Sequence, residues 1–269
     1  MDLDHARAVA VEAAEAAGKL LLDGTRGTVG VRPKGGSGDV VTDLDLASER
    51  LLVERIVSAY PSHSVIAEES GLLGASGGEW TWLVDPLDGT NNVAIGLPAY
   101  VVGLALCHED RPVLGVVHDP VTAQTWSAIR GCGALASSGT RLAALHRPSP
   151  HGPLLAWTQG YAVTRHDATA RGLRCALELE ARRVLQLWAP LLSWAMLARG
   201  DIDGMVGYRA EAVDLPAGAL IAREAGVEIR ALDGGPFEEG IGGTAEDRSF
   251  VAAHPEAMPG LLALVSGQL

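Results

Sequence analysis

Two aspartates that follow an apolar run are the residues best placed to do chemistry. The run Trp82-Leu83-Val84 ends in Asp85-Pro86-Leu87-Asp88, where Pro86 cannot join a strand ladder and keeps Asp85 extended. The chain therefore turns at the end of a buried strand, the edge at which α/β sheets commonly bind ligands. Asp85 and Asp88 can then point at one spot, and two close carboxylates repel each other unless a cation lies between them. The stretch predicts a site for a hard divalent ion, Mg2+ first, against the alternative of a turn capped by an Asx side chain.

The residues that follow Asp88 add a place for an anion. Gly89 allows a ligand to approach the backbone closely, and Thr90 stands at an expected helix start. Backbone N–H groups at a helix start favour negative charge, so the amides of Gly89 and Thr90 are candidate anion contacts.

Another acid, Asp45, lies near the start of a helix expected over 43–59. A carboxylate in the first helical turn is favoured by the helix dipole. In the simpler interpretation Thr42 or Asp43 caps this helix and no chemistry is involved. That interpretation explains one acid well and the neighbouring acids less well.

Acids also stand at the ends of two other expected elements. Glu68 and Glu69 follow a short strand at 63–67, and a solvated strand end is the alternative for them. Asp214 opens a helix expected over 214–224 and is by itself an ordinary N-cap. Acids that are brought together from such distant segments need cations to offset their repulsion.

The composition limits the expected partners and compartment. The 269 residues carry a formal net charge of −12, which argues against a basic nucleic-acid footprint and against binding to anionic membranes. The three cysteines are isolated and form no CxxC pair, so neither a disulfide framework nor a zinc site is expected. The N-terminus lacks the features of a signal peptide and no apolar run is long enough to span a bilayer, so a cytoplasmic protein is expected.

The order of the expected elements points to two units. Consecutive strands over 100–129 predict an antiparallel meander, and strands and helices alternate after the Pro-rich stretch 147–153. We expect an N-terminal α+β domain at 1–148, with the antiparallel sheet and most of the metal ligands. A C-terminal α/β domain at 149–269 is expected to contribute Asp214 and the substrate pocket.

Together these residues resemble a known family. The motif Asp85-Pro86-Leu87-Asp88-Gly89-Thr90 is preceded by Glu68-Glu69-Ser70 and followed by Asp214 and Glu224-Ala225-Gly226. The ordered set is similar to the inositol monophosphatase family, within the lithium-sensitive, magnesium-dependent phosphatases, and the similarity spans most of the chain. The resemblance implies an α/β (α+β) fold, a layered α-β-α-β-α sandwich of the sugar-phosphatase type, commonly as a homodimer.

The resemblance also implies a role for each residue of the site. Two or three Mg2+ ions are expected to be bound by the following groups: Glu68, Asp85, the carbonyl of Leu87, Asp88 and Asp214. Thr90, oriented by Asp45, and Glu68, acting through the metal, are expected to position the attacking water. The backbone amides of Gly89 and Thr90 are expected to contact phosphate, and Asn91 belongs to the same substrate-binding stretch.

The second half departs from the family on the substrate side. At 187–193 bulky apolar residues replace the small polar residues that contact sugar hydroxyls in family members. Trp188 either lines the leaving-group pocket, where it favours a flatter or more apolar alcohol such as a nucleoside, or lies buried in the core of the second domain. Glu211 either accepts substrate hydroxyls or is simply exposed. Lys34, in a Gly-rich loop, is interpreted as a surface charge in preference to a guide for phosphate.

The expected function is a Mg2+-dependent phosphomonoesterase. Its substrate is a small phosphorylated alcohol, either inositol phosphate-like, a sugar phosphate or a nucleoside monophosphate, which is hydrolysed by metal-activated water. The alternative is a catalytically silent protein that binds a metal or a sugar phosphate on the same fold. The expected partners are a small-molecule phosphate monoester and a second copy of the chain, with no nucleic acid and no membrane.

Overall fold

Helices and sheets of the chain are arranged in alternating layers. The computed structural model describes residues 1–34, 38–74 and 78–268. The helices are α1 (Leu3–Gly24), α2 (Asp43–Ala59), α3 (Thr90–Ala94), α4 (Ala168–Glu180), α5 (Pro190–Arg199), α6 (Pro216–Glu224), α7 (Met258–Ser266) and the short 3-10 helix η1 (Glu246–Arg248). One sheet has seven strands in the order β4 (Gly71–Gly74), β3 (Ser64–Ala67), β5 (Trp80–Asp88), β6 (Val101–His108), β7 (Arg111–Asp119), β8 (Gln124–Ile129) and β9 (Gly133–Ala136). The other has five strands in the order β11 (Arg183–Leu185), β10 (Leu154–Gln159), β12 (Gly204–Tyr208), β14 (Phe250–Ala253) and β13 (Glu228–Ala231). A separate hairpin is formed by β1 (Val31–Lys34) and β2 (Asp39–Thr42).

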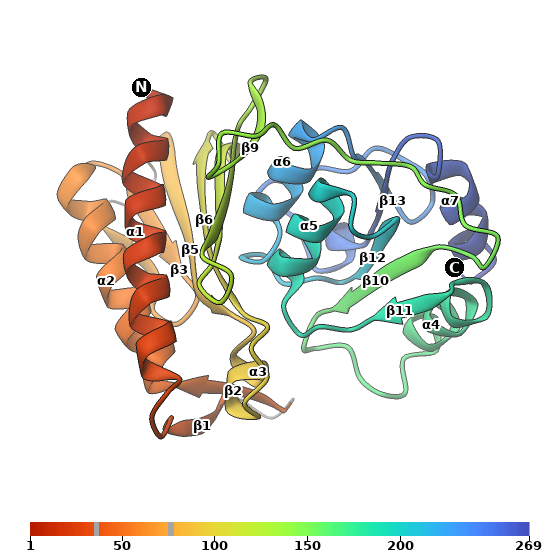
Figure 1. Cartoon of the computed structure of the whole chain (residues 1–269), viewed down its shortest axis with the longest axis horizontal. Helices are drawn as coiled ribbons and strands as arrows, with labels where there is room; N and C mark the ends of the chain where they lie inside the picture. The colour runs from red at the N-terminus through yellow and green to blue at the C-terminus, as the bar shows by residue number, and fades with distance from the viewer. Residues whose placement is uncertain (35–37, 75–77, 269) are drawn as a thin grey trace.

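The layers follow the predicted order. Helices α1 and α2 cover the outer face of the seven-stranded sheet, and α5 and α6 lie between the two sheets (Figure 1). Helices α4 and α7 cover the outer face of the five-stranded sheet. The predicted α-β-α-β-α sandwich of mixed α/β class is therefore confirmed.

Apolar cores fill the spaces between these layers. Trp82 of the first sheet packs in a core with Leu52 of α2, and Trp126 packs in the middle core with Trp194 of α5. Leu173 of α4 belongs to the third core, against the second sheet. Close-packed cores on both faces of each sheet give the strand ends fixed positions, which a site built on those ends requires.

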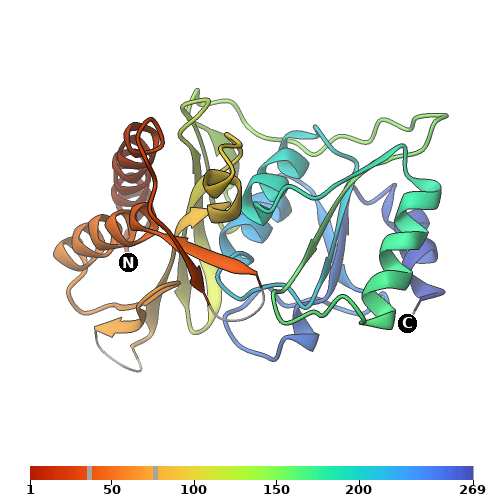
Figure 2. The same ribbon diagram turned by 90° about the horizontal axis from the view of Figure 1, so that it is seen from below.

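The strand ends that matter for function meet at one edge. β3 and β5 are parallel, with Ala67 paired to Val84, so both strands finish at the same side of the sheet. β5, β6, β7 and β8 pair in antiparallel fashion, which confirms the predicted meander. The β1–β2 hairpin and α3 lie at that end, at the bottom of Figure 1, and β2 reaches from the start of α2 toward the second half of the molecule (Figure 2).

Some boundaries differ from the sequence-based expectation. The helix expected over 214–224 begins at Pro216, so Asp214 lies in the turn before it and does not act as the N-cap. Thr42, rather than Asp43, caps α2, and it forms a capping box with Asp45. No helix within the described residues is long and apolar enough to cross a bilayer. The division into 1–148 and 149–269 stays a prediction, since the middle core joins residues of both parts.

Candidate metal centre and active site

Asp85 lies near the end of β5 and uses its two oxygens differently. The side chain is buried, and Oδ1 accepts the backbone N–H of Leu87 at 3.1 Å, as in an Asx turn. Oδ2 is also buried, and within the described residues it has no hydrogen-bond partner. A buried carboxylate oxygen without a partner is unfavourable, and a bound cation is the group that would stabilise it. The Asx turn and a metal site are therefore compatible, because each uses a different oxygen.

Glu68 and Asp88 approach Asp85 from two sides. Pairing between the parallel strands continues past the end of β3, where the N–H of Glu68 donates to the carbonyl of Val84 at 3.1 Å, so Glu68 lies beside Asp85. A bulge shifts the register of β5 against β6 between Asp85 and Asp88, and Asp88 is also buried. Such a bulge re-aims side chains, so both aspartates of one strand can serve the same site.

Burial and mutual repulsion raise the pKa values of these carboxylates. Burial first, and then Glu68, Asp88 and Asp214, raise the pKa of Asp85 well above its usual value. Burial and Asp214 do the same to the pKa of Asp88, and burial raises the pKa of Glu68 to about 7. Burial and Glu68 also raise the pKa of Asp214 well above its usual value. Carboxylates from three distant segments thus lie within electrostatic range of one another, and cations between them would favour their ionised forms.

Lys34 forms ion pairs with Glu68 and Glu69 at the end of β3. Its Nζ lies 2.7 Å from Oε1 of Glu68 and 2.7 Å from Oε1 of Glu69, and its side chain is half-buried. Burial alone would lower the pKa of Lys34, but the two glutamates outweigh it and raise that pKa. The surface interpretation of Lys34 is therefore wrong. Within the described ranges, no three Asp, Glu, His or Cys side chains already have the geometry of a metal site.

Thr90 connects this edge to α2. Its Oγ1 lies 2.6 Å from Oδ1 of Asp45 and 2.9 Å from the carbonyl of Leu87. Asp45 is fully buried, and burial raises its pKa while the hydrogen bonds from Thr42 and Thr90 act against that rise. Gly89 is left-handed with φ +106°, and a Cβ there would lie 2.7 Å from the carbonyl oxygen of Ala99. Thr90 is thus held with its hydroxyl between two groups assigned to the site.

The C-terminal half also reaches the acids of β5. The first turn of α5 supplies two N–H groups to Oδ2 of Asp88, from Leu191 at 2.7 Å and from Leu192 at 3.4 Å. Nδ2 of Asn92 donates to the carbonyl of Leu187, just before that helix. The positive end of a helix therefore faces Asp88 and favours its negative charge.

Comparison with known proteins decides the family. A model of the inositol monophosphatase family matches residues 2–268. The chain belongs to the inositol monophosphatase family. The predicted resemblance is therefore confirmed.

Individual members of the family are similar to this chain in sequence or in fold. Nus factor SuhB of Escherichia coli strain K12 is 31% identical over 263 residues, which cover 97% of this chain and 96% of that protein. Nus factor SuhB of Vibrio cholerae is 31% identical over 228 residues, which cover 84% and 85%. The solved inositol monophosphatase from Anabaena (Nostoc) sp. PCC 7120 has a TM-score of 0.85 at 27% identity, with 100% of this chain and 98% of that chain covered. The Thermotoga maritima IMPase has a TM-score of 0.83 at 26% identity, with 99% and 98% covered.

Asn91 and Glu211, two of the residues predicted to contact substrate, both lie next to Tyr161. Nδ2 of Asn91 lies 3.4 Å from the hydroxyl of Tyr161, and the N–H of Tyr161 donates to Oε1 of Glu211 at 2.9 Å. Glu211 is half-buried and also contributes to the raised pKa of Asp214, so the interpretation of Glu211 as simply exposed is wrong. Trp188 is 60% exposed, so its assignment to the core of the second domain is wrong as well.

The backbone of Trp188 is left-handed, with φ +51°. This conformation is unfavourable for a bulky side chain and is found more often at functional sites than elsewhere. Trp188 follows Leu187, whose carbonyl is bound by Asn92, so the tryptophan lies close to the α3 segment that carries the predicted phosphate contacts.

Ser48, Glu49 and Tyr161 were not predicted from the sequence, and the pairing of Lys34 with two glutamates was not predicted either. Ser48 and Glu49 share the inner face of α2 with Asp45, and acids at positions i and i+4 on one helical face were a readable signal. Lys34 and Tyr161 gave no such signal, because their partners are distant in the sequence.

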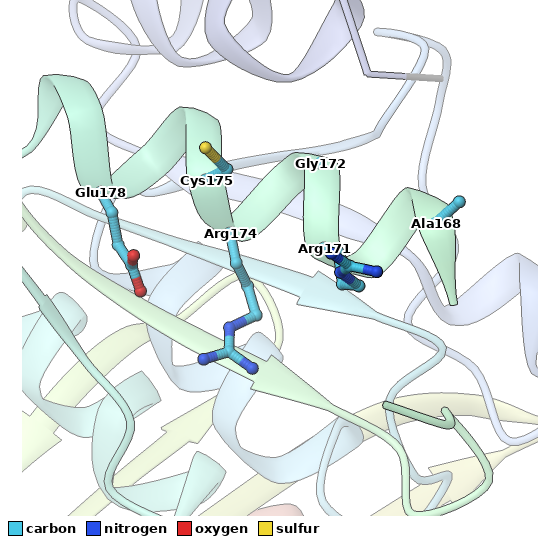
Figure 3. Close-up of a pocket in the computed structure, with 6 residues that line it drawn as sticks. All are labelled: Ala168, Arg171, Gly172, Arg174, Cys175 and Glu178. Atoms are coloured by element: carbon cyan, nitrogen blue, oxygen red, sulfur yellow. The ribbon is translucent and has the colours of Figure 1, made fainter. Parts of the chain in front are cut away.

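A hollow with a volume of about 550 Å³ lies along α4. It is lined by Ala168, Arg171, Gly172, Arg174, Cys175 and Glu178 (Figure 3). All of these residues belong to one helix, and none of them is a predicted site residue. The candidate active site is therefore the group of acids at the end of β3 and β5.

Proposed function

We propose that this member of the inositol monophosphatase family is a Mg2+-dependent phosphomonoesterase that hydrolyses a small phosphorylated alcohol. The observation that carries the proposal is the unpartnered, buried Oδ2 of Asp85, which lies among carboxylates that raise one another's pKa. Oxygen donors of this kind fit Mg2+. Two or three ions would be held by the following groups: Glu68, Asp85, the carbonyl of Leu87, Asp88 and Asp214. When bound, the metal supplies charge for the phosphoryl oxygens and lowers the pKa of a water.

The chain's own residues would position the reactants. The Thr90 hydroxyl, oriented by the carboxylate of Asp45, would hold the attacking water together with Glu68. The backbone amides of Gly89 and Thr90 would bind phosphate oxygens at the start of α3. Asp88, fixed by the N-terminus of α5, would stay in place as the leaving group departs. These roles contribute by orientation and by preorganised hydrogen bonds.

The alcohol of the substrate would lie on the aromatic side of the site. Asn91, Trp188 and Glu211 are the proposed contacts there, and Glu211 can accept hydrogen bonds from hydroxyl groups. An exposed tryptophan offers a stacking surface, which is worth about 1–3 kcal/mol for a nucleobase. We therefore place a nucleoside monophosphate, or another alcohol with a flat face, ahead of inositol phosphate among the candidates.

The test is a phosphate-release assay over a panel of monoesters, with and without Mg2+. The panel should contain inositol phosphates, sugar phosphates and nucleoside monophosphates, and Asp85→Asn should be run beside the unmodified chain. Mg2+-dependent release that Asp85→Asn abolishes supports the proposal. The absence of release over the whole panel, from protein that binds Mg2+, would defeat it.

The second candidate is a catalytically silent protein that binds a metal or a sugar phosphate on the same fold. The related proteins of Escherichia coli and Vibrio cholerae carry the name Nus factor, which does not denote a phosphatase. Retention of all predicted metal acids and of Thr90 favours the enzyme. The homodimer, the cytoplasmic location, the two-domain division and the absence of a nucleic-acid partner stay predictions.

A further inference from the structure

One face of α2 carries polar side chains where apolar ones are expected. Asp45 and Ser48 are fully buried, and Glu49 is only 3% exposed. Ser48 and Glu49 lie about one helical turn after Asp45, on the side of α2 that faces the first sheet. Buried polar groups are retained when they bind something specific, so each of them should have a defined partner.

Each of these side chains holds a different segment of the candidate site. Asp45 binds Thr90 of α3. The hydroxyl of Ser48 donates to the carbonyl of Pro86 at 2.8 Å, inside the stretch that carries Asp85 and Asp88. Glu49 reaches the turn that follows β3. Helix α2 is thus in contact with the start of α3, with the Asp85–Asp88 stretch and with the turn after β3.

Glu49 accepts two hydrogen bonds from the turn that follows β3. Its Oε2 accepts the backbone N–H of Glu69 at 2.7 Å, and its Oε1 accepts the hydroxyl of Ser70. Among the described residues, no Lys or Arg forms an ion pair with Glu49. A buried carboxylate without a cation depends on such hydrogen bonds, and the turn depends on the carboxylate for the same bonds.

The geometry of the turn links Glu49 to the metal site. Glu68 immediately precedes Glu69, and its own N–H is fixed to Val84 on the side of β5. With the next N–H and the Ser70 hydroxyl fixed to α2 by Glu49, the backbone on both sides of the Glu68 side chain is held. A neutral glutamine cannot accept both bonds as strongly, so the position of Glu68 would loosen.

We infer that Glu49 is a positioning residue, which fixes the turn 68–70 so that Glu68 points into the acid group and binds metal there. The inference rests on the proposed Mg2+ site and adds a residue that does not touch the metal. Residues that orient metal ligands commonly contribute 10- to 100-fold to metal affinity.

The experiment measures Mg2+ and Mn2+ affinity of the full chain by isothermal titration calorimetry, without any substrate. Glu49→Gln should weaken binding by roughly 10- to 100-fold, and Glu49→Asp should restore part of it. The control is Glu54→Gln, which changes an exposed glutamate of the same helix and should leave the affinity unchanged. Thermal unfolding in EDTA is recorded for each variant.

Three outcomes would overturn the inference. In the first, Glu49→Gln binds Mg2+ with the original affinity but unfolds at a lower temperature in EDTA. That result would give Glu49 a purely structural role. If Glu49→Gln does not fold, Ser70→Ala takes its place, because Ser70 is exposed and its hydroxyl makes one of the two hydrogen bonds to Glu49. An unchanged Mg2+ affinity of Ser70→Ala is the second outcome. An unmodified chain that binds Mg2+ without releasing phosphate defeats the proposed function and leaves the role of Glu49 intact. An unmodified chain that binds neither ion overturns both.

Discussion

Oδ2 of Asp88 accepts the backbone N–H of Leu191 at 2.7 Å, across 103 positions of the sequence. A predicted metal ligand of the first sheet is thereby oriented by the first turn of a helix from the second half of the chain. The helix end favours the carboxylate, whereas burial and Asp214 raise its pKa. The two halves of the molecule are therefore in contact at this side chain. Substitutions of Asp88 can separate its contact with α5 from its predicted role as a metal ligand.

Asp88→Asn and Asp88→Ala should differ in the metal-free protein. Asparagine keeps an oxygen for the N–H groups of α5 but loses the charge, so its unfolding temperature in EDTA should equal or exceed that of the unmodified chain. Alanine loses the contact as well, at about 0.5–2 kcal/mol. Both variants should lose roughly 1000-fold or more in Mg2+-dependent phosphate release. Equal stability of the two variants in EDTA would contradict the proposed contact with α5.

The stability of the metal-free protein should fall as the pH rises. The pKa values of Asp85, Asp88 and Asp214 lie well above their usual values in the folded state, and that of Glu68 is about 7. The folded state therefore binds more protons than the unfolded state above about pH 4, so the stabilisation present at acid pH is lost as these groups ionise.

This pH dependence is measured by thermal unfolding in EDTA between about pH 5 and about pH 8. Saturating Mg2+ should remove or reverse the trend, because the metal binds the ionised carboxylates. The control is Asp85→Asn, which should give a shallower slope in EDTA. A slope of the opposite sign in the metal-free chain would show that these acids do not repel one another.

Thr90→Ala should lower kcat for phosphate release by roughly 100- to 10,000-fold, the range for a group that positions or activates a reacting water. The Mg2+ affinity should change much less, since the hydroxyl of Thr90 is not a predicted ligand. Thr90→Ser keeps the hydroxyl 2.6 Å from Asp45 and should retain most of the activity. Steady-state kinetics of the three proteins decide the matter, and a serine variant as inactive as alanine would argue against the hydroxyl's role.

Trp188→Ala should change substrate preference rather than the chemical step. Loss of stacking would lower kcat/KM for a nucleoside monophosphate by about 1–3 kcal/mol, or roughly 5- to 150-fold. For inositol phosphate the loss should be small. A clear preference of the unmodified chain for inositol phosphate, or an equal loss for both substrates, would reject stacking on Trp188.

Gly115→Ala should destabilise the junction between β7 and α6. A Cβ at Gly115 would lie 2.6 Å from the carbonyl oxygen of Ala217 and 3.1 Å from its Cα, so helix and sheet would have to separate. We expect a loss of about 1–3 kcal/mol in unfolding free energy. Gly260→Ala is the control, because its Cβ meets nothing within 4 Å in α7 and should stabilise the helix slightly. Denaturant unfolding compares the two, and an unaffected Gly115→Ala would show that the two layers can separate without cost.

What the sequence predicted well was encoded locally. Asp85 and Asp88 could be placed near a strand end because an apolar run adjoins them, and the meander followed from consecutive apolar runs. The strand was expected to end before Pro86, but β5 continues through Pro86 to Asp88 across a bulge. Asp214 was grouped with the other acids because it stands at an expected helix start, and the family resemblance then made it a metal ligand. Its helix starts two residues later than expected, because Pro216 takes the first helical position.

What the sequence did not predict depends on contacts between distant segments. Lys34 looked like a loop charge, since nothing near it in the sequence shows that Glu68 and Glu69 lie 2.7 Å away. Tyr161 and Asn91 come from different halves of the chain and meet only after both sheets have formed. Trp188 has an exposed side chain and a left-handed backbone at a non-glycine residue, and local preferences argue against both.

The bulge between Asp85 and Asp88 has a consequence for how this chain can vary. Because successive strand residues alternate between faces, inserting or deleting one residue within the bulge would turn one aspartate away from the other. The turn at 121–123, which connects β7 to β8, faces solvent and could change length without moving any acid of the site. Among viable descendants of this chain, gaps in an alignment should therefore accumulate in surface turns, while the three-residue step from Asp85 to Asp88 keeps its length.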